Sequence, residues 1–124
     1  NMTHEAKRDI VARIAAGADS VGVNEIYIVD EPFRIASMAL DWMPLEAKVV
    51  TLGIELHHDA TDTERAVRAF VGEGVEVIVS LGGDGTNRII ARSAPQLELI
   101  PLSTGTNNVF PSMVEPTTAG VVAA

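Results

Sequence analysis

Apolar residues recur along the chain with two different periods, and the two kinds of segment alternate. Residues 3–16 repeat apolar side chains every three or four positions, which predicts an amphipathic helix that stops at Gly17. Short apolar runs are typical of buried strands, and they occur at residues 26–29, 49–52, 75–81 and 97–102. Helical periodicity returns between these runs, at residues 33–42, 61–72 and 86–93.

Alternation of strands and helices favours a parallel sheet with helices on both faces. We therefore predict a three-layer, Rossmann-like α/β domain with a mostly parallel sheet. Residues 116–124 look like the opening of a helix, with Thr117 as its cap, and the chain stops inside that segment. We accordingly expect residues 1–124 to be a single nucleotide-binding α/β domain cut from a longer protein.

Composition narrows the classes of partner. The 124 residues carry 17 acidic and 9 basic side chains, a formal net charge of −8, without a cluster of Lys and Arg. Such a surface repels a phosphate backbone, so we expect no nucleic-acid partner. The chain has no cysteine, which excludes disulfides and fits the cytoplasm, and no apolar run is long enough to span a membrane. A nucleotide partner stays open, since backbone N–H groups and a metal ion can bind phosphates.

The clearest strand, residues 75–81, leads directly into Gly82-Gly83-Asp84-Gly85-Thr86. Glycines let a ligand approach the main chain without a Cβ in the way. A helix beginning at Thr86 would direct free N–H groups and its positive dipole end at a phosphate. The carboxyl end of a strand is also where open α/β sheets bind ligands.

Asp84 is an unusual residue for a phosphate-binding turn, because its charge repels the ligand. It either binds a metal or takes a proton from an attacking hydroxyl, or it only caps the following helix. The turn lacks the Lys of a Walker A loop, and Asn87 stands where G-x-G-x-x-G needs glycine. The spacing therefore argues against dinucleotide-dependent hydride transfer.

At these residues the chain resembles a known superfamily. The segment 82–86 is similar to the signature shared by NAD kinases, diacylglycerol kinases and sphingosine kinases, and segment 101–111 resembles their second glycine loop. With Asn87 and Arg88, the pattern is most similar to the NAD-kinase-like group called acetoin catabolism protein X. In place of the Asn-Glu pair of the lipid kinases the chain has Arg88 and Ile89, which points away from a lipid acceptor.

The resemblance implies a two-domain kinase that uses ATP and Mg²⁺, with NAD as the acceptor. Its N-terminal domain would be of the NAD kinase/phosphofructokinase-like type, and a β-rich C-terminal domain would complete the acceptor site. Asp84 would act on the acceptor hydroxyl as base or orienting acid. The resemblance implies that the phosphates are lined by Gly82, Gly83, Gly85 and Thr86. It implies contacts to ribose or phosphate from Thr104, Gly105, Asn107 and Asn108.

Three functions remain possible from the sequence. The first is a kinase for a nucleotide hydroxyl, of which residues 1–124 alone would be inactive. The second is an accessory or regulatory protein, linked to acetoin catabolism, that binds nucleotide without catalysis. The third is a domain that acts only in assembly. A surface left by a missing domain could also allow a homo-oligomer.

Weaker candidates each have a plain structural alternative. His57, His58 and Asp59 could bind a metal, but neighbouring residues of an extended segment point to opposite sides, so we favour a solvated loop. Arg88 could reach a phosphate or pair with a surface acid. The segment 30–32 could border the pocket, and a simple turn explains it better.

Two further sets of residues complete the expectations. Asn107 and Asn108 could merely satisfy a turn, because Asn tolerates left-handed backbone geometry, yet we favour ligand contact. The large side chains of Met38, Trp42 and Met43 are expected on a core-facing helical stripe.

Overall fold

The computed structural model describes residues 3–29, 35–55, 57, 59, 61–81, 84–101 and 118–122. In this part of the chain, helices and strands alternate up to the last two strands, which follow one another. The elements are α1 (His4–Ser20), β1 (Glu25–Val29), α2 (Ile35–Leu40), β2 (Lys48–Leu52), α3 (Thr61–Gly72), β3 (Val77–Ser80), α4 (Asp84–Ser93), β4 (Glu98–Pro101) and β5 (Thr118–Val122).

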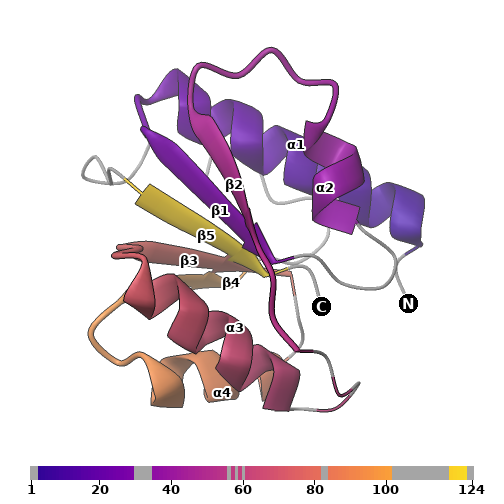
Figure 1. The fold of residues 1–124 in the computed structure, drawn as a ribbon. Coiled ribbons are helices and arrows are strands. Elements are labelled where there is room, and N and C mark those ends of the chain that lie inside the picture. The colour runs from indigo at the N-terminus through magenta and orange to yellow at the C-terminus, as the bar shows by residue number, and fades with distance from the viewer. Residues whose placement is uncertain are drawn as a thin grey trace.

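The strands form one sheet in the order β2-β1-β5-β3-β4, and every neighbouring pair is parallel. Helices α1 and α2 cover one face of the sheet and α3 and α4 cover the other (Figure 1). The predicted three-layer α/β domain is therefore confirmed. Because the sheet is parallel throughout the described residues, all its strands end at the same edge.

The core lies on both faces of the sheet, because successive side chains of a strand point to opposite sides. In β1, Ile26 and Ile28 pack with the buried faces of α1 and α2, whereas Tyr27 packs with α3 and α4. In β3, Val79 joins the first cluster and Ile78 the second. These two apolar layers fix the positions of all four helices against the sheet.

The C-terminal segment is a strand, so the prediction of a helix at residues 116–124 is wrong. Strand β5 lies in the middle of the sheet, between β1 and β3, and all five of its residues are buried. A Cβ on Gly120 would come within 3.0 Å of the ring of Phe70, which is itself fully buried. Gly120 thus lets α3 approach the sheet closely. The inference of a truncated helix loses its basis.

The end of the first helix also differs from the expectation. Helix α1 starts as predicted, with the Thr3 hydroxyl accepting a hydrogen bond from the Ala6 N–H at 3.0 Å. It continues through Gly17 to Ser20, since packing of its apolar face outweighs the low helix propensity of one glycine. The chain then turns at Gly22, whose φ is +89°.

The expected core position of two large side chains is wrong as well. Helix α2 ends at Leu40, so Trp42 lies beyond it and is 92% exposed. Met38 is 48% exposed on the outer side of the helix, whereas Met43 is half-buried against the core. The helical pattern predicted for residues 33–42 runs two residues past the end of α2, so Trp42 does not lie on the core-facing side of that helix.

Candidate functional site

Two neighbouring strands lead to the two glycine-containing segments. Strands β3 and β4 pair in parallel, with Ser80 opposite Pro101 at their carboxyl ends. The chain therefore leaves β3 and β4 at the same edge of the sheet and at adjacent positions. Of the predicted site residues, six lie outside the described part of the chain: Gly82, Gly83, Thr104, Gly105, Asn107 and Asn108.

The connections also change direction at this edge. Helix α2 connects β1 to β2 across one face, whereas α4 connects β3 to β4 across the other, and β5 lies between the two halves (Figure 1). Open α/β sheets bind ligands where neighbouring connections diverge in this way, outside the carboxyl ends of the strands. The carboxyl end of β5 lies at this divergence, next to the turn after β3. Segment 30–32, which follows β1, is outside the described residues.

Helix α4 presents its first turn at the same edge. The helix begins at Asp84 rather than at Thr86, so the carboxylate belongs to the first helical turn. Asp84 and Gly85 are exposed, Thr86 is half-buried, and a Cβ built on Gly85 would meet no atom within 4 Å. The N–H groups of a first turn have no partners within the helix. Together with the dipole they form a binding position for an anion.

Two polar groups at the end of this turn and just after it have no polar partner among the described residues. The Oδ1 atom of Asn87 is buried, and no group hydrogen-bonds to it within the described structure. Arg88 is exposed and forms no ion pair with any residue that the structure describes. Below them Ile90 and Ala94 are buried and hold the helix on the sheet. Asn87 shares their spacing of three and seven residues, the one sequence signal that could have singled it out.

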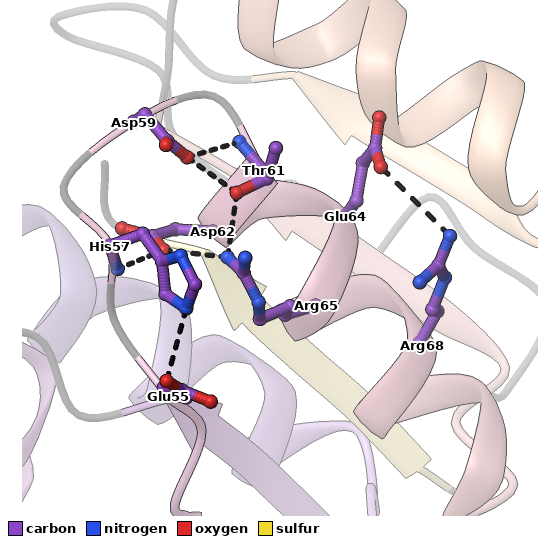
Figure 2. A network of polar contacts seen from close by, with 8 residues as sticks. All are labelled: Glu55, His57, Asp59, Thr61, Asp62, Glu64, Arg65 and Arg68. Atoms are coloured by element: carbon purple, nitrogen blue, oxygen red, sulfur yellow. Dashed lines mark hydrogen bonds and ion pairs between the residues drawn. The ribbon is translucent and has the colours of Figure 1, made fainter.

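Two residues of the weaker metal candidate, His57 and Asp59, make polar contacts at the start of α3 (Figure 2). Asp59 accepts hydrogen bonds from the N–H of Thr61, at 2.9 Å, and from its hydroxyl. The hydroxyl bond, then the backbone bond and the nearby charges of His57 and Arg65, hold the pKa of Asp59 below its usual value of 3.8. This carboxylate therefore serves the helix terminus.

Further contacts complete the same cap. Asp62 accepts a hydrogen bond from the N–H of His57 at 2.7 Å and pairs with Arg65 at 3.0 Å. The imidazole Nε2 of His57 lies 3.2 Å from Glu55 Oε1 (Figure 2). His58 is outside the described residues. Within the described ranges, no group of three His, Cys, Asp or Glu side chains is placed to hold a metal ion.

None of the helices that the structure describes combines the length and the apolar character that crossing a bilayer requires. The longest, α1, has one buried apolar stripe and charged residues elsewhere, as expected of a helix that packs on a sheet.

Comparison with known proteins places this geometry in a family. The N-terminal domain of ATP-NAD kinase matches residues 10–124. Acetoin catabolism protein X of Cupriavidus necator is 33% identical over 131 residues, which covers 91% of this chain and 33% of that protein. An uncharacterized protein of Archaeoglobus fulgidus is 33% identical over 88 residues, covering 71% of this chain and 28% of that protein. The chain thus spans about a third of the curated relatives it matches. No solved structure matches it.

Proposed function

Because the chain belongs to the ATP-NAD kinase family, we propose that it binds the nucleotides of a phosphoryl transfer from ATP to a hydroxyl of NAD. The single observation that supports this most strongly is the first turn of α4. It presents an exposed carboxylate, N–H groups that have no partner within the helix, and an open glycine at the carboxyl edge of a parallel sheet.

In the proposed reaction Asp84 acts on the acceptor. Its carboxylate accepts the proton of the acceptor hydroxyl while the hydroxyl oxygen bonds to the γ-phosphorus of ATP. The bond between that phosphorus and the bridging oxygen breaks, and ADP leaves with the electron pair. An exposed carboxylate at the start of a helix can meet a hydroxyl brought by a second substrate, which fits this role.

The remaining predicted residues are assigned to binding. We assign the donor phosphates to Gly82, Gly83, Gly85 and Thr86. We assign ribose and phosphate contacts to Thr104, Gly105, Asn107 and Asn108. Mg²⁺ would neutralise the donor phosphates.

The whole protein is proposed to contain more than this domain. The relatives are about three times as long as the matched segment, which supports a further domain that completes the acceptor site. We propose that this is the β-rich domain implied by the family resemblance and that residues 1–124 alone are inactive. Since ATP and NAD are both available there, the cytoplasm is the proposed compartment.

A second candidate is a nucleotide-binding accessory protein without catalysis. The observation that favours it is the name of the relative from Cupriavidus necator, which assigns that protein to acetoin catabolism and states no kinase activity. Such a protein would keep the phosphate-binding turn and respond to nucleotide levels.

Incubation of the protein that carries this chain with ATP, Mg²⁺ and NAD distinguishes the two. The kinase proposal expects NADP to accumulate with time and enzyme concentration, measured by chromatography, and a parallel reaction with polyphosphate tests the donor. The accessory proposal expects a calorimetric binding signal for ATP or NAD and no NADP. Absence of both binding and product would contradict both proposals.

A further inference from the structure

We propose that Arg88 binds a phosphate group of the donor nucleotide and thereby sets the affinity of the α4 turn for ATP. This inference rests on the proposed function and goes beyond it, since it assigns the task to a cation outside segment 82–86. The argument starts from a comparison of the four arginines that α3 and α4 carry.

Three of these arginines are held by neighbouring side chains. Arg65 donates to the Thr61 hydroxyl at 2.7 Å and pairs with Asp62 at 3.0 Å. The Oε2 atom of Glu64 lies 3.9 Å from Nη2 of Arg68, and its Oε1 atom lies 3.7 Å from Nη2 of Arg92. Among the described residues, no acid pairs with Arg88. The fold therefore uses three of the arginines and leaves one guanidinium available.

The available guanidinium lies one turn after the start of the helix. Arg88 is four residues after Asp84, so the two residues lie on the same face of α4, one turn apart. Helical side chains lean toward the N-terminus and cover the turn before their own Cα. The side chain of Arg88 can thus extend over Gly85, where no Cβ occupies the space.

The negative charges around this turn give a cation at position 88 a function. The chain has a net charge of −8, and Asp84 adds a negative charge at the turn itself, so a polyphosphate meets repulsion at this edge. A guanidinium offers two parallel N–H donors to phosphate and stays charged at any physiological pH. Arg88 would offset the repulsion from Asp84 without neutralising the carboxylate needed for the acceptor.

The neighbouring residue also has an unused polar atom, an acceptor that suits a hydroxyl or amino donor rather than a phosphate. The buried Oδ1 atom of Asn87 has no hydrogen-bond partner within the described structure, a state that is costly in a protein interior. The Oδ1 atom of Asn87 and the guanidinium of Arg88, at consecutive positions, thus have no polar partner among the described residues. In the cap of α3, by contrast, the polar groups contact one another. Asp59 accepts a hydrogen bond from Thr61, and Arg65 donates to both Thr61 and Asp62.

The experiment replaces Arg88 and its matched control on the same helix in the protein that carries this chain. Calorimetry measures the Kd of ATP at several salt concentrations for the wild type, Arg88→Gln, Arg88→Lys and Arg92→Gln. We expect Arg88→Gln to weaken ATP binding about tenfold and to reduce the salt dependence, since one phosphate contact is lost. Arg88→Lys should recover part of the affinity, and Arg92→Gln should bind like the wild type.

The outcomes separate this inference from the proposed function. An unchanged Kd and salt dependence in Arg88→Gln would overturn the role of Arg88 while leaving nucleotide binding intact. Equal losses in Arg88→Gln and Arg92→Gln would overturn it too, because the effect would then be one of general surface charge. Failure of the wild type to bind ATP would overturn both. Circular dichroism of each variant identifies any that fails to fold, and Arg88→Lys then decides the matter.

Discussion

Helices α3 and α4 lie side by side on one face of the sheet and begin at the same edge, yet their first turns differ (Figure 1). In α3 the polar groups contact one another: Asp59 with Thr61, and Asp62 with both His57 and Arg65. In α4 the carboxylate of Asp84 is exposed, and the Oδ1 atom of Asn87 has no partner in the described structure.

The difference shows how a capped helix end is distinguished from a binding position. A helix N-terminus leaves N–H groups without partners, and its own neighbours can satisfy them, as Asp59 does for α3. A buried polar atom without any partner costs about 1–3 kcal/mol, so it calls for a partner such as a water or a ligand group. For α4 a bound nucleotide would be that partner. Composition alone does not reveal this difference between the two turns, since each contains at least one acid and at least one threonine.

Replacing the carboxylates of the two turns gives the largest expected effect. Asp84→Asn should lower kcat for NADP formation by about 10²–10⁴-fold, because the amide cannot accept the proton of the acceptor hydroxyl. Steady-state kinetics of the protein that carries this chain measures this.

Asp62→Asn is the matched control for that experiment. It removes the ion pair with Arg65 and should cost about 0.2–1 kcal/mol of stability while kcat stays unchanged. Equal kcat for Asp84→Asn and the wild type would remove Asp84 from the mechanism. An equal loss in both variants would mean that the two turns do not differ in function.

The close contact beneath α3 gives the next effect. Gly120→Ala places a Cβ about 3.0 Å from the buried ring of Phe70, so either α3 or β5 must shift. We expect the free energy of unfolding to fall by about 1–3 kcal/mol, measured by urea denaturation. ATP affinity of the folded fraction should not change if α3 serves only as support. A loss of affinity with no change in stability would contradict that separation.

The smallest effect concerns the pH dependence of the α3 cap. The pKa of Asp59 is lower in the folded state than its ordinary value of 3.8, so the ionised cap stabilises the protein fully above pH 3.8. This stabilisation is lost as the pH falls through the folded-state pKa. The wild type should therefore have a higher Tm than Asp59→Asn at pH 6, and the gap should close below pH 3.8. A gap of constant size down to pH 2.5 would contradict the assignment.

Most of the fold followed from the sequence because the hydrophobic pattern specifies buried strands and amphipathic helices locally. Residues 75–81 were recognisable as a strand from a largely apolar run that ends at Gly82, and β3 (Val77–Ser80) lies within that run. Strand β5 was not, since Ala119 and Gly120 have low strand propensity. Its conformation follows from parallel pairing with β1 and β3, a tertiary interaction that a local pattern does not contain.

The candidate site was predictable in part. The strand-turn-helix order around Asp84 followed from the glycines and the preceding apolar run, although the helix begins two residues earlier than expected. Whether these groups are used depends on which donors reach Oδ1 of Asn87 and which acids reach Arg88 in three dimensions. From the sequence alone, Arg88 could either bind a phosphate or pair with a surface acid. Its lack of an acidic partner among the described residues favours the phosphate.

Amide hydrogen exchange tests most directly whether the first turn of α4 is the nucleotide site. With saturating ATP and Mg²⁺, we expect exchange at residues 84–88 to slow, because their N–H groups gain phosphate partners and the turn is ordered. Residues 61–65 of α3, already capped by Asp59, should exchange at the same rate with and without nucleotide. Slowing in α3 but not in α4, or in neither while ATP is bound, would contradict the account.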